Sequence, residues 1–297
     1  MTVPPWLAGA VRTSPWPHLH AVVAGIGVSG FAAADALLGL GARVTVVDER
    51  VGEGETDRAR VLEVLGATVR LGPDATRELP RDAGLVVTSP GWRPNAPLLV
   101  AAAEASVPVW GEVELAWRLR DPDRPAPWLA VTGTNGKTTT TALVGELARA
   151  AGLAATVAGN IGSAVLDVLA AIESGASWPD VFVLELSSFQ LETVSSLKPT
   201  AAAVLNVTPN HMDRYAGLAD YAAAKARIFN GARVQVLNRD DAIVRLMRRA
   251  GETVQTFGSS VPLSEEEWGL VERPGGAWLA RGGELIVPAG SLSLMGR

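Results

Sequence analysis

The sequence predicts an α/β protein built from two successive parallel sheets that are covered by helices. Short apolar runs alternate along the chain with longer stretches that carry a helical pattern. This alternation is typical of parallel sheets with helices on both faces. Residues 121–127 interrupt it with three prolines in seven positions, which neither a helix nor a central strand can accommodate. Because the alternation then restarts, we expect one domain at residues 1–124 and a second at 125–297.

The elements of the first domain follow in order from residue 21. Apolar runs predict strands at residues 21–24, 43–47 and 85–88. Helical patterns predict helices at residues 29–40 and 56–65, and a glycine of the kind that ends helices follows each one. Ser89, Pro90 and Gly91 predict a turn directly after the third strand.

The second domain repeats this pattern. Apolar runs predict strands at residues 129–132, 181–186 and 201–205. Helices are expected at residues 137–152, 218–228 and 242–250. The sequence Arg281-Gly282-Gly283-Glu284 predicts a hairpin turn between two short apolar runs near the end of the chain.

The composition narrows the class of function. The chain has 297 residues and 48% hydrophobic content, enough for substantial cores, but no apolar stretch reaches the roughly 18 residues that span a bilayer. Its start lacks the charged and apolar regions of a signal peptide. The absence of cysteine excludes disulfides and thiolate metal sites and is consistent with a reducing cytoplasm. A net charge of −5 argues against a broad nucleic-acid surface. We expect a cytoplasmic protein that binds neither membranes nor nucleic acid.

A first glycine loop, Gly25-Ile26-Gly27-Val28-Ser29-Gly30, lies between a predicted strand and a predicted helix. Its glycines permit a tight turn and the close approach of a diphosphate to the helix N-terminus. Asp48 ends the next strand, where an acid could bind a ribose hydroxyl. The motif does not distinguish NAD from another nucleotide diphosphate, and a glycine turn that serves only packing is the alternative.

A second glycine loop carries one of the chain's rare lysines. Only three of 26 basic residues are lysines, and Lys137 lies in Gly133-Thr134-Asn135-Gly136-Lys137-Thr138-Thr139, between a strand and a helix. Backbone N–H groups in such a loop wrap phosphates, the lysine reaches the β- and γ-oxygens, and the Thr138 hydroxyl can bind Mg²⁺. The loop is shorter than the usual motif, because Val131 stands where a first glycine is normal. A surface turn rich in glycine and threonine is the alternative.

Other candidate groups are polar residues in or beside buried strands. Glu185 follows four apolar residues, and a carboxylate there needs either a nearby Mg²⁺ or an ion pair. Asn160 is a loop amide that, alone, indicates a turn. His211 follows the strand at 201–205, at the edge where open sheets bind ligands, although a lone histidine is often structural. Lys225 lies 14 residues further on, whereas Lys198 precedes a proline and indicates an exposed turn.

Together these phrases resemble the Mur ligase family, ATP-dependent amide-forming enzymes of peptidoglycan precursor synthesis. Residues 133–139, 159–162, 185–192 and 211–215 follow in the family's order. The last two phrases, the first glycine loop and Thr88-Ser89-Pro90-Gly91 most resemble the member that adds D-glutamate. The resemblance spans nearly the whole chain. It implies an N-terminal Rossmann-like domain followed by a central P-loop ATPase-type parallel-sheet domain.

The resemblance also implies the substrates and their contacts. The first domain would bind a UDP-sugar rather than NAD, through Gly27, Val28, Ser29, Asp48, Arg50, Ser89, Pro90 and Gly91. Asn160 would contact the muramoyl group. ATP would lie on Gly133, Thr134, Asn135, Gly136, Lys137, Thr138 and Thr139. The catalytic groups would be Lys137, His211 and Lys225.

Two Mg²⁺ ions are implied as well. Thr138 and Glu185 would hold one, and His211 the second together with a carbamate on Lys225. A lysine must lose its proton before it can attack CO₂, and moving its pKa from about 10.4 to about 7.4 costs roughly 4 kcal/mol. Neighbouring Mg²⁺ would assist by lowering that pKa. An arginine could not be modified in this way because it stays protonated.

The implied reaction joins D-glutamate to UDP-N-acetylmuramoyl-L-alanine through an acyl phosphate, in the synthesis of the cell wall that determines cell shape and division. We expect a monomer. Asn210 stands where the family usually has aspartate, and the chain ends where the family continues into a C-terminal ligase domain, so we expect this chain alone to be inactive. The alternatives are another amino acid specificity, a non-catalytic UDP-sugar-binding protein, or an NAD-binding oxidoreductase domain fused to an ATPase.

Overall fold

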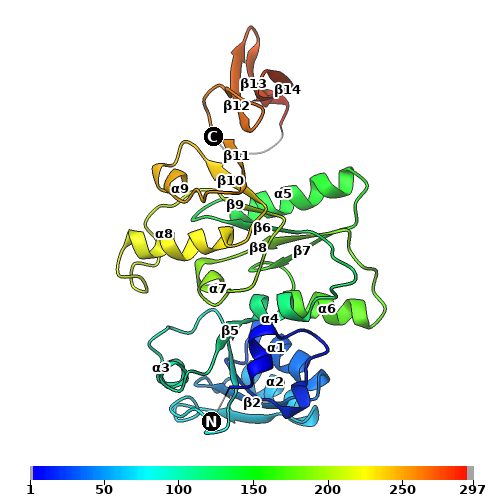
Figure 1. Ribbon diagram of the computed structural model, residues 1–297, viewed down its shortest axis with the longest axis vertical. Helices are drawn as coiled ribbons and strands as arrows, with labels where there is room; N and C mark the ends of the chain where they lie inside the picture. Colours follow the sequence, from blue (N-terminus) through cyan, green and yellow to red (C-terminus); the bar gives the residue numbers. More distant parts are fainter. Residues whose placement is uncertain (1–2, 293–297) are drawn as a thin grey trace.

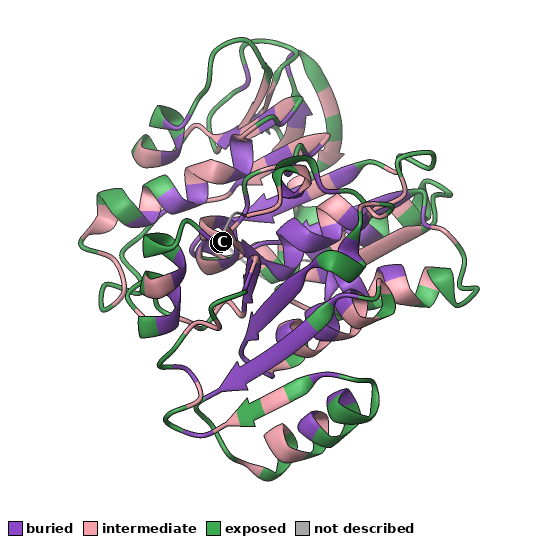
Figure 2. Cartoon of the chain, turned by 60° about the horizontal axis from the view of Figure 1, so that its bottom comes forward, coloured by how far each residue is buried: buried purple, intermediate pink, exposed green. Residues whose placement is uncertain are grey.

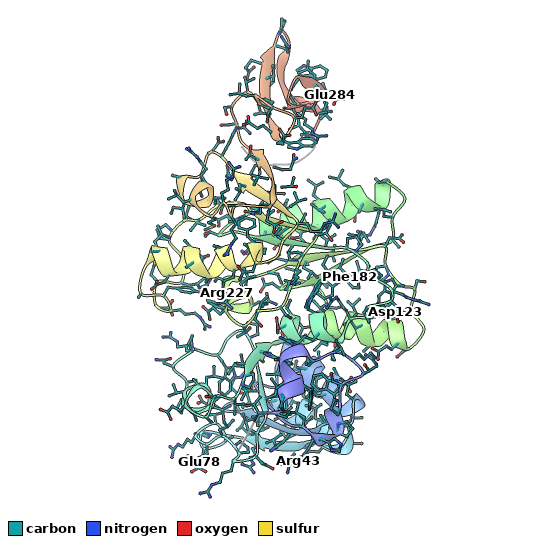
Figure 3. The ribbon with its side chains drawn as sticks, viewed as in Figure 1. Arg43, Glu78, Asp123, Phe182, Arg227 and Glu284 are labelled. Atoms are coloured by element: carbon teal, nitrogen blue, oxygen red, sulfur yellow. The ribbon has the colours of Figure 1, made fainter. Side chains whose placement is uncertain are left out.

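Two sheets divide the part of the chain that the computed structural model describes, residues 3–292 (Figure 1). Sheet A lies at one end of an elongated molecule, sheet B occupies the middle, and a hairpin projects at the far end. Figure 3 shows the same separation by residue: Arg43 and Glu78 lie at the sheet A end, Phe182 in the middle, and Glu284 on the projecting hairpin. None of the helices in residues 3–292 has the length and apolar character required to cross a bilayer.

Sheet A has five strands, all parallel, in the order β3-β2-β1-β4-β5. Its strands are β1 (His20–Ala24), β2 (Arg43–Asp48), β3 (Thr68–Leu71), β4 (Leu85–Thr88) and β5 (Val109–Gly111). Its helices are α1 (Val28–Gly39), α2 (Glu53–Val64), α3 (Pro97–Glu104) and α4 (Glu112–Leu119). The three strands and two helices predicted here are confirmed, and α2 begins three residues earlier than the predicted helix.

The two faces of sheet A pack against different clusters. Ala21 and Val23 of β1 belong to a core that extends into sheet B, whereas Val22 and Ala24 pack with α3 on the opposite face. Successive side chains of a strand point to opposite faces, so a fully apolar strand is what a sheet covered on both sides requires. Figure 2 shows the central strands buried along their length.

Sheet B has nine strands in the order β14-β13-β12-β11-β10-β9-β6-β8-β7. Its strands are β6 (Trp128–Thr132), β7 (Ala155–Gly159), β8 (Val181–Glu185), β9 (Ala201–Val204), β10 (Val234–Asn238), β11 (Thr253–Phe257), β12 (Glu267–Arg273), β13 (Gly276–Arg281) and β14 (Glu284–Pro288). Its helices are α5 (Lys137–Ala150), α6 (Val165–Glu173), α7 (Ser188–Glu192), α8 (Leu218–Ala226) and α9 (Ala242–Leu246). The predicted α/β class is confirmed.

Sheet B is mixed rather than wholly parallel. Strands β6 to β12 run parallel, but β13 pairs antiparallel with both β12 and β14. Arg281 and Glu284 face each other across the β13–β14 turn, which confirms the predicted hairpin. The expectation of a parallel sheet therefore holds for the central strands and not for this edge.

Helix α9 is shorter than the predicted helix at 242–250. The Gln235 side chain donates a hydrogen bond to the Arg249 carbonyl at 3.1 Å and accepts one from its N–H at 2.9 Å. In a continued helix the Arg249 N–H would donate to the Arg245 carbonyl, but here it donates to Gln235, and α9 ends at Leu246.

Each sheet has a point where the order of strands changes direction. In sheet A, β1 lies between β2 and β4; in sheet B, β6 lies between β8 and β9. Open α/β sheets bind ligands at the carboxyl ends of the strands at such points. Both glycine loops begin here, one directly after β1 and the other directly after β6.

Two buried carboxylates of α4 join the two halves of the molecule. Glu112 Oε1 accepts a hydrogen bond from the N–H of Leu166 at 2.7 Å, and Glu114 Oε2 accepts from Ser195 and Ser196 at 2.8 and 2.9 Å. Both glutamates are buried, so this contact fixes α4 against the sheet B half. Figure 3 labels Asp123 in the connecting segment at the side of the molecule.

Candidate active site

A cavity of about 770 Å³ opens at the carboxyl edge of sheet A. Eight of the residues predicted to bind a UDP-sugar line it: Gly27, Val28, Ser29, Asp48, Arg50, Ser89, Pro90 and Gly91. The rest of the lining consists of residues that sequence reasoning missed: Glu49, Trp92, Arg93, Asn95, Ala96 and Pro97. Most of these follow the predicted turn after β4, and their position beside it was the available signal.

The first glycine loop packs tightly against α1. Gly25 has φ +100°, in the region that favours glycine, and its N–H donates to the Val47 carbonyl at 2.7 Å. A β-carbon on Gly30 would lie 1.8 Å from the Gly25 carbonyl oxygen. The third glycine is therefore explained by packing alone, whereas Gly27 precedes the first turn of α1 and faces the cavity.

Asp48 stabilises this loop. Its carboxylate accepts hydrogen bonds from the N–H groups of Ile26 and Arg50, both at 2.9 Å, and from the Arg50 guanidinium at 3.0 and 3.2 Å. Burial raises the pKa of Asp48, but these bonds outweigh it and the net effect is a lowered pKa. Arg50 remains largely exposed over the cavity, where its positive charge suits a diphosphate.

The second glycine loop begins after β6. Gly136 has φ +81° and precedes the first residue of α5, Lys137, whose Nζ donates to the Thr134 carbonyl at 3.1 Å. The Thr138 hydroxyl donates to Glu185 Oε2 at 2.7 Å, and the Asn160 amide donates to Glu185 Oε1 at 2.7 Å. The structure thus joins residues from β6–α5, β7 and β8 that are far apart in the sequence. Asn160 lies here, and not among the residues that line the sheet A cavity.

Glu185 fits a cation site. Its side chain is 1% exposed, and no lysine, arginine or histidine of residues 3–292 forms an ion pair with it. Within the described residues, the alternative that Glu185 forms an ion pair is therefore wrong. A buried carboxylate needs compensation, and a hydroxyl beside a carboxylate gives the oxygen ligands that Mg²⁺ prefers.

Asn206, which sequence reasoning missed, fixes the loop from the neighbouring strand. Its carbonyl accepts from the Thr134 N–H at 2.9 Å, its side-chain oxygen accepts from the Asn135 N–H at 2.9 Å, and its amide donates to the Asn135 carbonyl at 3.1 Å. Its position just after β9, at the same sheet edge as the loop, was the signal that could have revealed it.

Lys225 lies beneath the same loop. Its side chain is 1% exposed, its Nζ donates to the Gly133 carbonyl at 2.7 Å, and its Nζ lies 4.6 Å from the centre of the Tyr221 ring. Burial, with a smaller contribution from the positive charge of Lys137, lowers the pKa of Lys225 to about 7. Lys198, by contrast, is exposed, as predicted.

His211 approaches this region from the segment after β9. It is exposed and has φ +55°, and the Asn210 side chain accepts a hydrogen bond from its N–H at 2.9 Å. Its ring centre lies 4.8 Å from that of Phe189 and 6.3 Å from that of Tyr221, the residue that also contacts Lys225. Within residues 3–292, no three His, Asp or Glu side chains gather into a metal-binding cluster. The contacts place His211 near the loop without making it a ligand by themselves.

The fold and the glycine–lysine loop after β6 define an α/β protein of the P-loop class. The chain belongs to the Mur ligase family: residues 19–111 match the MurD-like N-terminal domain of Mur ligases, and residues 131–268 match the Mur ligase middle domain. The family expected from the sequence phrases is thereby confirmed.

Curated relatives carry the name UDP-N-acetylmuramoylalanine–D-glutamate ligase. That of Streptomyces avermitilis is 50% identical over 239 residues, which cover 79% of this chain and 49% of the relative. That of Aromatoleum aromaticum is 46% identical over 290 residues, covering 94% of this chain and 60% of the relative. The chain therefore spans between about half and three fifths of the length of these relatives.

A solved structure supports the fold. The UDP-N-acetylmuramate:L-alanyl-γ-D-glutamyl-meso-diaminopimelate ligase from Neisseria meningitides superposes with a TM-score of 0.56 at 19% identity, covering 94% of this chain and 89% of that one. At this identity the likeness concerns the arrangement of helices and strands only.

Proposed function

We propose that this chain forms the UDP-sugar-binding and ATP-binding parts of a ligase that adds D-glutamate to UDP-N-acetylmuramoyl-L-alanine in peptidoglycan precursor synthesis. The observation that carries the nucleotide chemistry is Glu185, a buried carboxylate that has no ionic partner within residues 3–292 and is hydrogen-bonded to Thr138 beside the glycine–lysine loop. The specificity rests on the names of relatives that are 46–50% identical across both halves of the chain.

The two sites have complementary roles in this proposal. Arg50 and the N-terminus of α1 face the cavity at sheet A and suit the diphosphate of a UDP-sugar. The loop 133–139 suits the phosphates of ATP, with Lys137 on the β- and γ-oxygens and Asn206 keeping the loop in shape. Asn160 would contact the muramoyl substrate from beside Glu185.

The reaction proceeds in two displacements. A carboxylate oxygen of the UDP-sugar substrate attacks the γ-phosphorus of ATP, and the bond from this phosphorus to the β–γ bridging oxygen breaks. ADP is the leaving group, and the product is an acyl phosphate. The amine of D-glutamate then attacks the acyl carbonyl, loses a proton and displaces phosphate. Lys137 would neutralise negative charge on the transferring phosphoryl group, the main requirement of this chemistry.

Magnesium fits the residues present. Thr138 and Glu185 would hold one ion, and His211 and a carbamate on Lys225 a second. Bound Mg²⁺ would supply positive charge beside the phosphates. The buried, weakly basic Lys225 amine is suited to carbamate formation, because a neutral amine is required.

We assign residues 1–124 to the UDP-sugar domain and residues 125–297 to the ATP domain, in a monomer that works on small molecules in the cytoplasm. The two sheets and the proline-rich segment between them support this division. The absence of cysteine from the chain supports a reducing compartment.

Binding tests this proposal more directly than turnover, because the chain spans about half the length of its relatives. The experiment is calorimetric titration of the 297-residue chain with UDP-N-acetylmuramoyl-L-alanine, with NAD⁺ in parallel. A matched pair of variants, Asp48→Asn in the cavity and Asp57→Asn on the exposed face of α2, controls for unspecific charge effects.

We expect the UDP-sugar to bind, NAD⁺ not to bind, and only Asp48→Asn to weaken binding. Binding of NAD⁺ alone would overturn the proposal and make the first glycine loop a dinucleotide site. A further titration uses a non-hydrolysable ATP analogue with Mg²⁺. Binding of the UDP-sugar without binding of this analogue would favour a non-catalytic UDP-sugar-binding protein instead.

A further inference from the structure

The two candidate sites are connected by a buried arginine that neither site uses. Arg214 lies three residues after His211, and its side chain is 7% exposed. Its guanidinium contacts both halves of the molecule: Nη1 donates to the Trp92 carbonyl at 2.8 Å, and Nη2 donates to Glu192 Oε2 at 2.5 Å. Trp92 belongs to the loop that lines the sheet A cavity, and Glu192 ends α7 on the sheet B side.

On the sheet B side, Arg214 and His211 share a neighbour. The Arg214 guanidinium lies 4.1 Å from the centre of the Phe189 ring, and the His211 ring centre lies 4.8 Å from it. The N–H groups of Arg214 and Tyr215 also donate to the His211 carbonyl, at 2.9 and 3.2 Å. The arginine is therefore in contact with the His211 segment both through the turn and through the aromatic ring.

On the sheet A side, Arg214 fixes the loop after β4. Its bond to the Trp92 carbonyl restrains the backbone that presents Ser89 and Trp92 to the cavity. A second contact, between Arg93 and Asp213 at 2.8 Å, joins the same two segments, but these side chains are 57% and 71% exposed. Exposed ion pairs contribute little, whereas a buried, multiply bonded guanidinium is specific in geometry.

A small cavity of about 180 Å³ lies at this junction. Arg214, Phe189 and Glu192 line it from one side, and Ser89, Pro90 and Trp92 line it from the other. The last three also line the larger cavity at sheet A. The Ser89 hydroxyl is buried and has no hydrogen-bond partner among the described residues. The loop after β4 therefore forms part of the wall of both cavities, and its position sets part of the shape of each.

We propose that Arg214 is a positioning residue that couples occupation of the UDP site to the conformation of the His211 segment. The inference rests on the proposed function, because it takes the sheet A cavity to bind the UDP group. A ligand that orders the loop after β4 orders residues 211–215 through Arg214. A ligand at the phosphate loop then meets a segment that is already ordered, which is a form of positive coupling.

UDP is the probe that separates this coupling from direct contact, because it reproduces the nucleotide and lacks the muramoyl and alanyl groups that could reach His211. Backbone hydrogen exchange of the 297-residue chain is measured with and without saturating UDP. The peptides at 25–31, 46–52 and 88–97 report on the cavity, and peptides across 211–217 report on the coupled segment. The variants are Arg214→Met and Arg214→Lys. Arg77→Met is the matched control, because Arg77 forms an exposed ion pair with Asp74 and lines neither cavity.

In the wild type we expect UDP to slow exchange in the cavity peptides and to slow it about five-fold or more at 211–217, as for a segment held closed by a bound ligand. Arg214→Met should keep the protection of the cavity and lose that of 211–217. Arg214→Lys should restore part of the lost protection, and Arg77→Met should behave like the wild type. A cooperative thermal unfolding transition is required of each variant as a check that it is folded. If Arg214→Met is not folded, the loss of protection at 211–217 in Arg214→Lys relative to the wild type is the test of the coupling.

The outcomes distinguish the two levels of the proposal. Protection of the cavity without protection of 211–217 in the wild type, or unchanged protection of 211–217 in Arg214→Met, would overturn the coupling and leave the UDP site intact. No protection of the cavity peptides would overturn the proposed function and the coupling together.

Discussion

Lys225 Nζ donates a 2.7 Å hydrogen bond to the carbonyl oxygen of Gly133, the first residue of the phosphate loop. The lysine is buried, and no carboxylate of the described chain forms an ion pair with it. A buried ammonium without a counter-ion favours loss of the proton. The structure therefore places a weakly basic amine next to the loop.

The first prediction is that Lys225 forms a carbamate. In a solution of ¹³C-bicarbonate, the wild type should show a carbamate carbon signal that Lys225→Arg lacks and that Lys198→Arg, a change at an exposed lysine, retains. The neutral amine is the reactive form, and the pKa of Lys225 is lowered to about 7. The signal should therefore grow as the pH rises from 6 to 8, where each unit changes the ratio of neutral to charged amine about tenfold. A signal that persists in Lys225→Arg would contradict this assignment.

The second prediction concerns magnesium. Glu185→Gln keeps the shape and the acceptor for the Thr138 hydroxyl but removes the buried charge. It should abolish the gain in affinity that Mg²⁺ gives to binding of a non-hydrolysable ATP analogue, a loss of about 10–100-fold. Glu146→Gln, on the exposed face of α5, is the matched control. Equal Mg²⁺ dependence in wild type and Glu185→Gln would exclude Glu185 as a ligand.

Much of the fold was predictable because its signals are local. Apolar runs placed the strands β1, β4 and β8 to within a residue of their observed ends, since most positions of a strand that is buried on both faces must be apolar. The end of α9 was not predictable, because it depends on the Gln235 side chain, which comes from another strand and binds the Arg249 backbone.

The candidate site was likewise predictable only where its signals are local. As candidate site residues, Lys137 was predicted from the loop motif and Glu185 from a carboxylate inside an apolar run. Asn206 and Arg214 were not, because their roles depend on contacts with residues 71 and 122 positions away. The sequence contains both side chains but no periodicity or spacing that pairs them with those partners.

The third prediction is a pH-dependent stability from Glu112. Burial raises the pKa of Glu112 to about 7, only partly offset by the hydrogen bond from Leu166, and the nearby Asp167 raises it further. The folded state therefore binds a proton that the unfolded state releases above about pH 4.5. Stability falls as the pH rises from about 4.5 to 7 and is then constant, by an amount of order 3 kcal/mol.

Glu112→Gln removes this titration. The melting temperature of Glu112→Gln should exceed that of the wild type at pH 8, and the difference should vanish towards pH 4.5. Glu104→Gln, at an exposed position of α3, should show no such trend. A difference between Glu112→Gln and wild type that is the same at pH 5 and pH 8 would show that Glu112 does not change its charge in this range. Asp167 and Asp35 face the same region. Both are unchanged in Glu112→Gln, so the difference between the two proteins reports on Glu112.

The fourth prediction compares two glycines of the same helix, α1. A β-carbon on Gly30 would meet the Gly25 carbonyl oxygen at 1.8 Å, whereas one on the exposed Gly39 would meet no atom of the described residues within 4 Å. Gly30→Ala should therefore destabilise the fold by about 1–3 kcal/mol or more, the cost of forcing extra volume into a packed site. Gly39→Ala should stabilise it by about 0.5–1 kcal/mol, the usual gain in a helix. Thermal unfolding of both variants measures the difference.

Gly30→Ala should also weaken UDP binding, because relieving the clash moves α1 away from the loop that presents Gly27 to the cavity. Equal effects of the two substitutions would show that the loop does not approach α1 as closely as the structure requires.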